Sequence, residues 1–171
     1  MSMENVQTIK QVCDAYKLLL ATAESVTVGR LQSMIGAISG ASTFFRGGIT
    51  AYDIEQKVQV LGVTRAHAEL VNCVSTQVAA EMAEGATRIF NADISLATTG
   101  YAEPPNELEP SLSYAFYAIW DKREAQSNPV RSGRVNHIGA SRTDTQQFFA
   151  DYVVRELVDY FKSIEGKAVI D

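Results

Sequence analysis

The sequence predicts a single α/β domain in which helices cover both faces of a mixed, mostly parallel sheet, giving three layers, α/β/α. Short apolar segments typical of buried strands, residues 18–23 and 93–99, alternate with stretches in which apolar residues recur every three or four positions. The 171 residues can bury one substantial core, and no repeat, low-complexity tract or long linker divides them. We therefore predict one domain over residues 1–165 and a flexible tail over residues 166–171.

The first half of the chain predicts two strands and three helical stretches. Helical spacing of apolar residues over 6–19 predicts an opening helix that leads into the buried strand at 18–23. A second helical stripe covers 31–38. Residues 47–52 are typical of a second strand, and a shorter helical stretch covers 54–61. Strand, polar turn and helix thus follow one another in order.

The next helix is predicted over 78–89, where Ser75 can cap its first turn. The third buried strand, 93–99, follows it and ends in a threonine pair. Three prolines interrupt residues 100–110, which predicts a loop there.

A fourth strand is predicted over 114–120, and 130–138 is a weaker, partly polar strand candidate. The short segment 121–128 between them permits a hairpin, so the sheet should contain an antiparallel component. Residues 149–164 show the clearest helical stripe in the chain and should close the core.

Composition excludes several classes of function. The formal net charge of -5 weighs against a broad basic surface, so neither a nucleic acid nor a membrane is an expected partner. The first ten residues lack the apolar core of a leader, and we expect a cytoplasmic protein. Cys13 and Cys73 show no metal-ligand or disulfide spacing, so we expect two buried thiols in a reducing compartment.

Three polar clusters follow the predicted strands. Glu24 to Thr27 follow the first strand, Tyr52 and Asp53 end the second, and Thr98 to Gly100 end the third. The carboxyl ends of parallel strands form the usual ligand crevice of an open α/β sheet, because free backbone N–H groups of the following helices point there. The three clusters are therefore predicted to converge.

Ser25 and Lys57 each allow a structural and a chemical interpretation. Ser25 can cap the following helix, the common role of serine at this position, or act as a nucleophile. No Ser-His-Asp arrangement is evident, so a nucleophilic serine would need a lysine as its base. Lys57 can be a solvated surface lysine, or a base whose pKa is depressed by a helix start and by desolvation. The local sequence favours the structural interpretation of both.

The residues around these clusters resemble a known family pattern. That pattern is alanine-glutamate-serine-cysteine-threonine-glycine-glycine, then arginine-glycine-glycine, a tyrosine, and a lysine five residues later. The corresponding residues here are Ala23, Glu24, Ser25, Val26, Thr27, Val28, Gly29, Arg46, Gly47, Gly48, Tyr52 and Lys57. On these residues the chain resembles the CinA C-terminal domain family, the nicotinamide mononucleotide deamidases, and the match spans most of residues 18–160.

The resemblance implies an amidase that converts nicotinamide mononucleotide to nicotinate mononucleotide and ammonia. Ser25 would attack the carboxamide, Lys57 would serve as base, and Tyr52 would help proton transfer. The implied substrate-binding residues are Glu24, Thr27, Gly29, Thr99, Gly100 and Arg142. Neither a metal nor a cofactor is implied, the partner is a small nucleotide-like substrate, and family analogy suggests a homo-oligomer.

The chain departs from the family pattern around the predicted substrate. Val28 and Leu112 occupy glycine positions, and Glu109 stands where the family has a lysine. Glu103 lies in the family's glycine-rich loop, where a carboxylate about 5 Å from a phosphate would repel it by roughly 1–3 kcal/mol. Arg142 is the leading phosphate partner, although it can equally be a surface arginine, while the companion arginine one turn later is Gln146.

These departures leave a second function open, a catalytically impaired homologue that binds a nucleotide-like ligand or acts in assembly. A role in DNA uptake or repair, which the family's competence label suggests, finds no support in the acidic composition.

Overall fold

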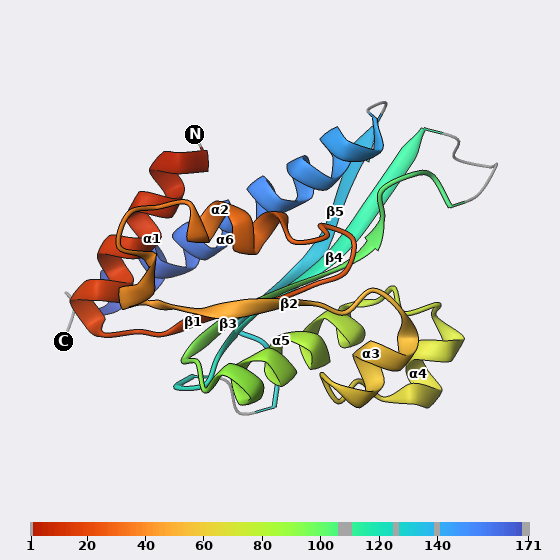
Figure 1. The fold of residues 1–171 in the computed structure, drawn as a ribbon, viewed down its shortest axis with the longest axis horizontal. Helices are drawn as coiled ribbons and strands as arrows, with labels where there is room; N and C mark the ends of the chain where they lie inside the picture. Colours follow the sequence, from red (N-terminus) through yellow and green to blue (C-terminus); the bar gives the residue numbers. More distant parts are fainter. Residues whose placement is uncertain (1, 106–110, 125–126, 139–140, 169–171) are drawn as a thin grey trace.

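The computed structural model describes residues 2–105, 111–124, 127–138 and 141–168. Six α-helices, one 3₁₀ helix and five strands occupy these ranges (Figure 1). Their order is α1 (Ser2–Tyr16), β1 (Leu20–Glu24), α2 (Arg30–Gly36), η1 (Ala41–Thr43), β2 (Phe45–Thr50), α3 (Ile54–Gln59), α4 (Arg65–Leu70), α5 (Thr76–Phe90), β3 (Ile94–Tyr101), β4 (Leu112–Asp121), β5 (Arg131–Ile138) and α6 (Arg142–Ala168).

The sheet has the strand order β2-β1-β3-β4-β5. β1 pairs in parallel with β2 and β3, whereas β4 is antiparallel to both β3 and β5. Four strands therefore run in one direction and only β4 runs against them. Helices α1, α2 and α6 cover one face, and α5 covers the other together with α3 and α4 (Figure 1). The predicted three-layer α/β/α domain with a mixed, mostly parallel sheet is confirmed.

Apolar clusters fill the space between these layers. On one face, Val153 and Leu157 of α6 are fully buried and pack with Ile9 of α1, while Phe149 of α6 belongs to a smaller cluster with Val26 and Val135. On the other, α5 buries Val78 and neighbouring small residues against the sheet. The predicted helical stripes are therefore the faces that the helices bury.

The parallel pairing of three strands brings the polar clusters together. Glu24 at the end of β1 lies opposite Thr98 of β3 and Thr50 of β2. Just beyond, the Ser25 N–H donates to the Thr98 carbonyl at 3.0 Å, and the Ala51 N–H donates to the Glu24 carbonyl at 2.9 Å. The predicted convergence at the carboxyl ends of the strands is confirmed.

Three local features differ from the sequence prediction. β3 continues to Tyr101, so Gly100 lies in a strand rather than a loop. A Cβ at Gly100 would lie 2.4 Å from the Tyr114 carbonyl of β4, which shows how closely these strands approach. Helix α4 was not predicted, because it buries only Ala68 and therefore shows no apolar stripe. Helix α6 continues to Ala168, past the predicted start of the tail, since a single glycine does not end it. Residues 169–171 lie outside the described residues.

The described part of the chain contains no helix that is both long and apolar enough to cross a membrane.

Gly85 of α5 packs closely against the backbone of Leu61, and its replacement tests this packing. A Cβ on Gly85 would lie 2.1 Å from the backbone oxygen of Leu61, just after α3. We expect Gly85→Ala to lower the free energy of unfolding by about 1–3 kcal/mol through overpacking. Gly36→Ala is the matched control, because nothing lies within 4 Å of its Cβ and the change should stabilise by about 0.4–1 kcal/mol. Urea denaturation measures both, and equal effects would contradict the described packing.

Candidate active site

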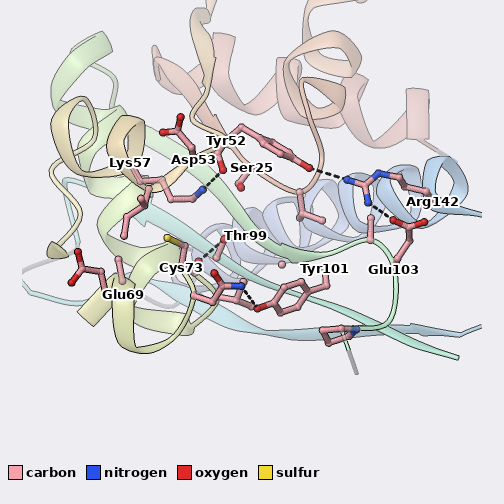
Figure 2. Close-up of a pocket in the computed structure, with 18 of the residues that line it drawn as sticks. Ser25, Tyr52, Asp53, Lys57, Glu69, Cys73, Thr99, Tyr101, Glu103 and Arg142 are labelled. Atoms are coloured by element: carbon pink, nitrogen blue, oxygen red, sulfur yellow. Dashed lines mark hydrogen bonds and ion pairs between the residues drawn. The ribbon is translucent and has the colours of Figure 1, made fainter. Parts of the chain in front are cut away.

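A pocket of about 650 Å³ opens where β1, β2 and β3 end. Its size is that of a small-molecule site. Figure 2 shows the labelled side chains gathered around it from segments far apart in the sequence. Its lining includes Ser25, Tyr52, Lys57, Thr99, Gly100 and Arg142 among the residues predicted from the sequence. Glu24, Thr27 and Gly29 are not on its wall.

Ser25 is held in the turn between β1 and α2. Its side chain lines the pocket, and its hydroxyl makes no hydrogen bond with any other described residue. Helix α2 begins only at Arg30, so Ser25 is not its capping residue. The interpretation of Ser25 as a helix cap is therefore wrong. The N–H groups of Val26 and Thr27, which follow directly, donate to no acceptor within the described ranges.

The carboxylate of Glu24 stabilises this turn through hydrogen bonds. Its carboxylate is fully buried and accepts hydrogen bonds from the backbone N–H groups of Leu31 at 3.1 Å and Gln32 at 2.8 Å. The hydroxyl of Thr27, also fully buried, donates to the same carboxylate at 2.6 Å. Gly29 has a φ of 84° at the start of α2. These three residues shape the turn that carries Ser25 and do not line the pocket; their contact with substrate stays a prediction.

Removing the Glu24 carboxylate should destabilise the fold as well as the turn. Glu24→Ala leaves two N–H groups and one hydroxyl without their acceptor, and we expect a loss of about 2–4 kcal/mol. Glu24→Gln keeps the shape and one acceptor oxygen, so its loss should be smaller. Urea denaturation compares the two. An unchanged urea midpoint for Glu24→Ala would show that the carboxylate does not stabilise the turn.

Lys57 lies in the last turn of α3 and is only 2% exposed. Its Nζ donates to the Tyr52 carbonyl at 2.8 Å. Burial lowers the pKa of Lys57 below its ordinary value, and the charge of Asp53 counters this only in part. Lys57 is not a solvated lysine, so that interpretation is wrong. Desolvation is confirmed as a cause of the lowered pKa, but a helix start is not, because Lys57 is at the other end of α3.

Tyr52 turns its ring away from Lys57. Its hydroxyl accepts a hydrogen bond from Arg142 Nη2 at 2.8 Å, and Arg142 Nη1 donates to Glu103 Oε2 at 2.6 Å. Figure 2 shows Arg142 and Glu103 on the opposite side of the pocket from Lys57, with the ring of Tyr52 extending toward them. Glu103 raises the pKa of Arg142, so the guanidinium stays charged. The carboxylate expected to repel a phosphate is thus paired with the arginine expected to bind one.

Asn72, Cys73 and Tyr101 also line the pocket but were not predicted as site residues. Thr99 Oγ1 donates to the Cys73 carbonyl at 2.6 Å, and Asn72 Nδ2 donates to the Tyr101 hydroxyl at 2.8 Å. Cys73 is only half-buried, so the expectation that both thiols are buried is wrong for it. Asn72 and Cys73 have positive φ angles, 48° and 61°. Asparagine tolerates this conformation, but no sequence signal indicates it for cysteine.

The departures from the family pattern occupy different places. Val28 has a φ of 48°, a left-handed conformation that costs a residue with a side chain about 1–2 kcal/mol and a glycine much less. Leu112 begins β4 opposite Ile138 and does not line the pocket. Gln146 is buried. Glu109 lies outside the described residues.

The family model of the CinA C-terminal domain matches residues 3–159. A CinA-like protein of Chlorobium limicola is 33% identical over 161 residues, which cover 94% of this chain and 37% of that protein. A putative competence-damage inducible protein of Thermoanaerobacter pseudethanolicus is 40% identical over 122 residues, covering 70% of this chain and 30% of that protein. The chain thus spans about a third of the length of these curated relatives.

Solved structures agree with this assignment. The competence or damage-inducible protein of Enterobacter asburiae superposes with a TM-score of 0.81 at 24% identity, covering 94% of this chain and 98% of that one. The CinA superfamily protein of Escherichia coli gives 0.77 at 26% identity, covering 92% and 89%. The first shows the fold alone, whereas the family model covers nearly the whole sequence. The chain belongs to the CinA C-terminal domain family.

Proposed function

We propose that this domain is an amidase that hydrolyses the carboxamide of nicotinamide mononucleotide or a related pyridine amide, giving the carboxylate and ammonia. The observation that carries the proposal is the position of Lys57, a buried amine whose pKa is lowered by desolvation. It lines the same pocket as Ser25, whose hydroxyl has no hydrogen-bond partner among the described residues. Family membership supports it. A serine and a neutral lysine are sufficient for acyl transfer without a metal.

The proposed reaction has two halves. Ser25 Oγ attacks the carboxamide carbon while its proton passes to the neutral Nζ of Lys57. The C–N bond then breaks, the Lys57 ammonium returns the proton to the departing nitrogen, and ammonia leaves an ester on Ser25. Water attacks this ester, Lys57 accepts its proton and returns it to Ser25 Oγ, and the carboxylic acid product leaves and ionises.

The oxyanion formed in both halves needs hydrogen-bond donors. The unused N–H groups of Val26 and Thr27 come directly after Ser25, and Val26 lines the pocket. Backbone donors of this kind stabilise charge that develops on a carbonyl oxygen without reorganising. We assign the oxyanion site to this turn.

A second function is favoured by one observation. Lys57 Nζ donates to the Tyr52 carbonyl, whereas the Ser25 hydroxyl has no partner among the described residues. A protein that keeps this arrangement with its ligand bound would be a binding homologue without turnover. Stabilisation by nicotinamide mononucleotide in thermal unfolding, without ammonia release, would favour it.

The direct test of the amidase is ammonia release by the wild-type protein. Nicotinamide mononucleotide and nicotinamide riboside are each incubated with it, and ammonia and the carboxylate product are quantified together. We expect equal amounts of both products from at least one of the two amides. Absence of ammonia from either amide, at any pH from neutral to mildly alkaline, would contradict the proposal.

A further inference from the structure

The side of the pocket opposite Lys57 contains an arginine that is already occupied. Arg142 donates from Nη1 to Glu103 at 2.6 Å and from Nη2 to the Tyr52 hydroxyl at 2.8 Å (Figure 2). Both terminal nitrogens of the guanidinium therefore have a partner within the protein, and its charge faces a carboxylate. A phosphate that binds the remaining N–H donors of Arg142 would lie close to the Glu103 carboxylate and would be repelled by it.

The remaining charges of the pocket are also unfavourable to a phosphate. Its described lining contains three carboxylates, Asp53, Glu69 and Glu103, and two cationic side chains, Lys57 and Arg142. Glu103 neutralises Arg142, and burial lowers the pKa of Lys57. Glu69 shares Arg65, 3.6 Å away, with Glu55, which binds that guanidinium through both carboxylate oxygens at 2.7 Å. The pocket therefore favours a neutral or cationic ligand over an anion.

Aromatic rings point to the same preference. Tyr52 and Tyr101 both line the pocket, and Tyr52 is 55% exposed. The face of a tyrosine ring attracts a cation. A pyridine ring linked to a sugar through its nitrogen carries a positive charge, so such rings suit these walls whether or not a phosphate is attached.

Resting on the proposed amidase function, we infer that Glu103 determines substrate specificity by occupying Arg142. The preferred substrate is then a carboxamide on a cationic ring without a phosphate group. The Ser25 side of the pocket selects the amide, and the Glu103 side rejects the phosphate.

Glu103 can be replaced without endangering the fold. The side chains of Arg142 and Glu103 are 45% and 65% exposed, and an ion pair this accessible contributes little to stability. Glu103→Gln keeps the size of the side chain and removes its charge, which leaves Arg142 available to an anion. The consequence of the change should therefore lie in ligand choice.

The test compares two ligands that differ only by a phosphate, nicotinamide riboside and nicotinamide mononucleotide. Calorimetric titration uses the full chain carrying Ser25→Ala, so that neither ligand is consumed. We expect the riboside to bind about tenfold more tightly, equivalent to about 1.4 kcal/mol. With Glu103→Gln added, the ratio of the two affinities should move at least about tenfold toward the mononucleotide. Adding Arg142→Gln as well should remove this gain.

Glu69→Gln is the matched control, because it removes one carboxylate from the same pocket without touching Arg142. In Glu69→Gln the ratio of the two affinities should change less than about threefold, because only the long-range electrostatic potential in the pocket changes. The inference would be overturned if the mononucleotide bound more tightly than the riboside before Glu103 is changed, or if neither ligand bound. It would also be overturned if the ratio of the two affinities did not change in Glu103→Gln, or changed equally in Glu69→Gln.

The inference and the amidase proposal fail in different ways. Ammonia release combined with a preference for the mononucleotide leaves the amidase and overturns the role of Glu103. The expected order of binding without ammonia release from the wild-type protein supports the role of Glu103 in ligand choice and overturns the amidase.

Discussion

Ser25→Ala is expected to lower kcat for ammonia release by about 10³–10⁶-fold, because the variant lacks the hydroxyl that attacks the carboxamide in the proposed reaction. The Ser25 N–H still donates to the Thr98 carbonyl in the variant, so the turn should keep its shape. Affinity for the amide should change little, since the hydroxyl acts on the reacting carbon. Steady-state ammonia release and calorimetric binding, measured on the same preparation, separate the two effects.

Ser33→Ala is the matched control for this prediction. Ser33 lies on the exposed face of α2, eight residues beyond Ser25, and does not line the pocket. Its replacement should leave kcat within about twofold, as is usual for surface positions. If Ser25→Ala retained a comparable rate, Ser25 could not be the nucleophile.

Lys57→Met is expected to lower kcat by about 10²–10⁴-fold, the usual contribution of a general base. The same change should leave the free energy of unfolding equal or higher. Methionine fills a similar volume and ends the burial of an amine that is 2% exposed, which offsets the lost hydrogen bond to Tyr52. Activity and urea denaturation test the two halves together. A large loss of stability would show that Lys57 serves the fold rather than the reaction.

The pH dependence of Lys57 gives a second check on its role. Only the neutral amine accepts a proton, so the rate should rise with pH through the lowered pKa of Lys57 and level off above it. Between this lowered pKa and the ordinary value of 10.5, the unfolded chain binds a proton that the folded chain does not. Stability should therefore rise with pH across that window in the wild type.

Lys162→Met serves as the control for both measurements, because Lys162 is exposed on α6 and, among the side chains that the structure describes, forms its ion pair with Asp159, at 3.8 Å. It should retain the wild-type rate and the wild-type dependence of stability on pH. In Lys57→Met, the rise of stability with pH across this window should disappear. An identical profile in Lys57→Met would mean that Lys57 is not the group with the lowered pKa.

Much of the fold could be predicted from the sequence because the patterns that define it are local. The buried strands β1 and β3 appear as short apolar runs, and the faces of α5 and α6 recur at helical spacing. Their parallel pairing then brings Ser25 and Thr99 to one pocket without further information. Helix α4 could not be predicted, since its only buried residue is Ala68 and no buried apolar residues recur at helical spacing.

The parts of the site that escaped prediction depend on contacts between distant residues. Glu103 and Arg142 are 39 residues apart, and nothing local indicates that they pair. The position of Glu24 beside Ser25 suggests the pocket, but its carboxylate turns inward to the N–H groups at the start of α2. Cys73 reaches the wall through a left-handed backbone that its residue type does not favour. Packing decides where a side chain points, and the sequence pattern of a strand carries no information about that packing.

The most direct measurement of the central claim is the identity of the acylated residue. Wild-type protein mixed with nicotinamide riboside or nicotinamide mononucleotide is quenched in acid during turnover and digested, and its peptides are analysed by mass spectrometry. We expect an ester of the pyridine carboxylic acid on Ser25 in the wild-type protein, and we expect no such ester in Ser25→Ala. Acylation of Cys73, the half-buried thiol of the same pocket, or ammonia release with Ser25 never acylated, would contradict it.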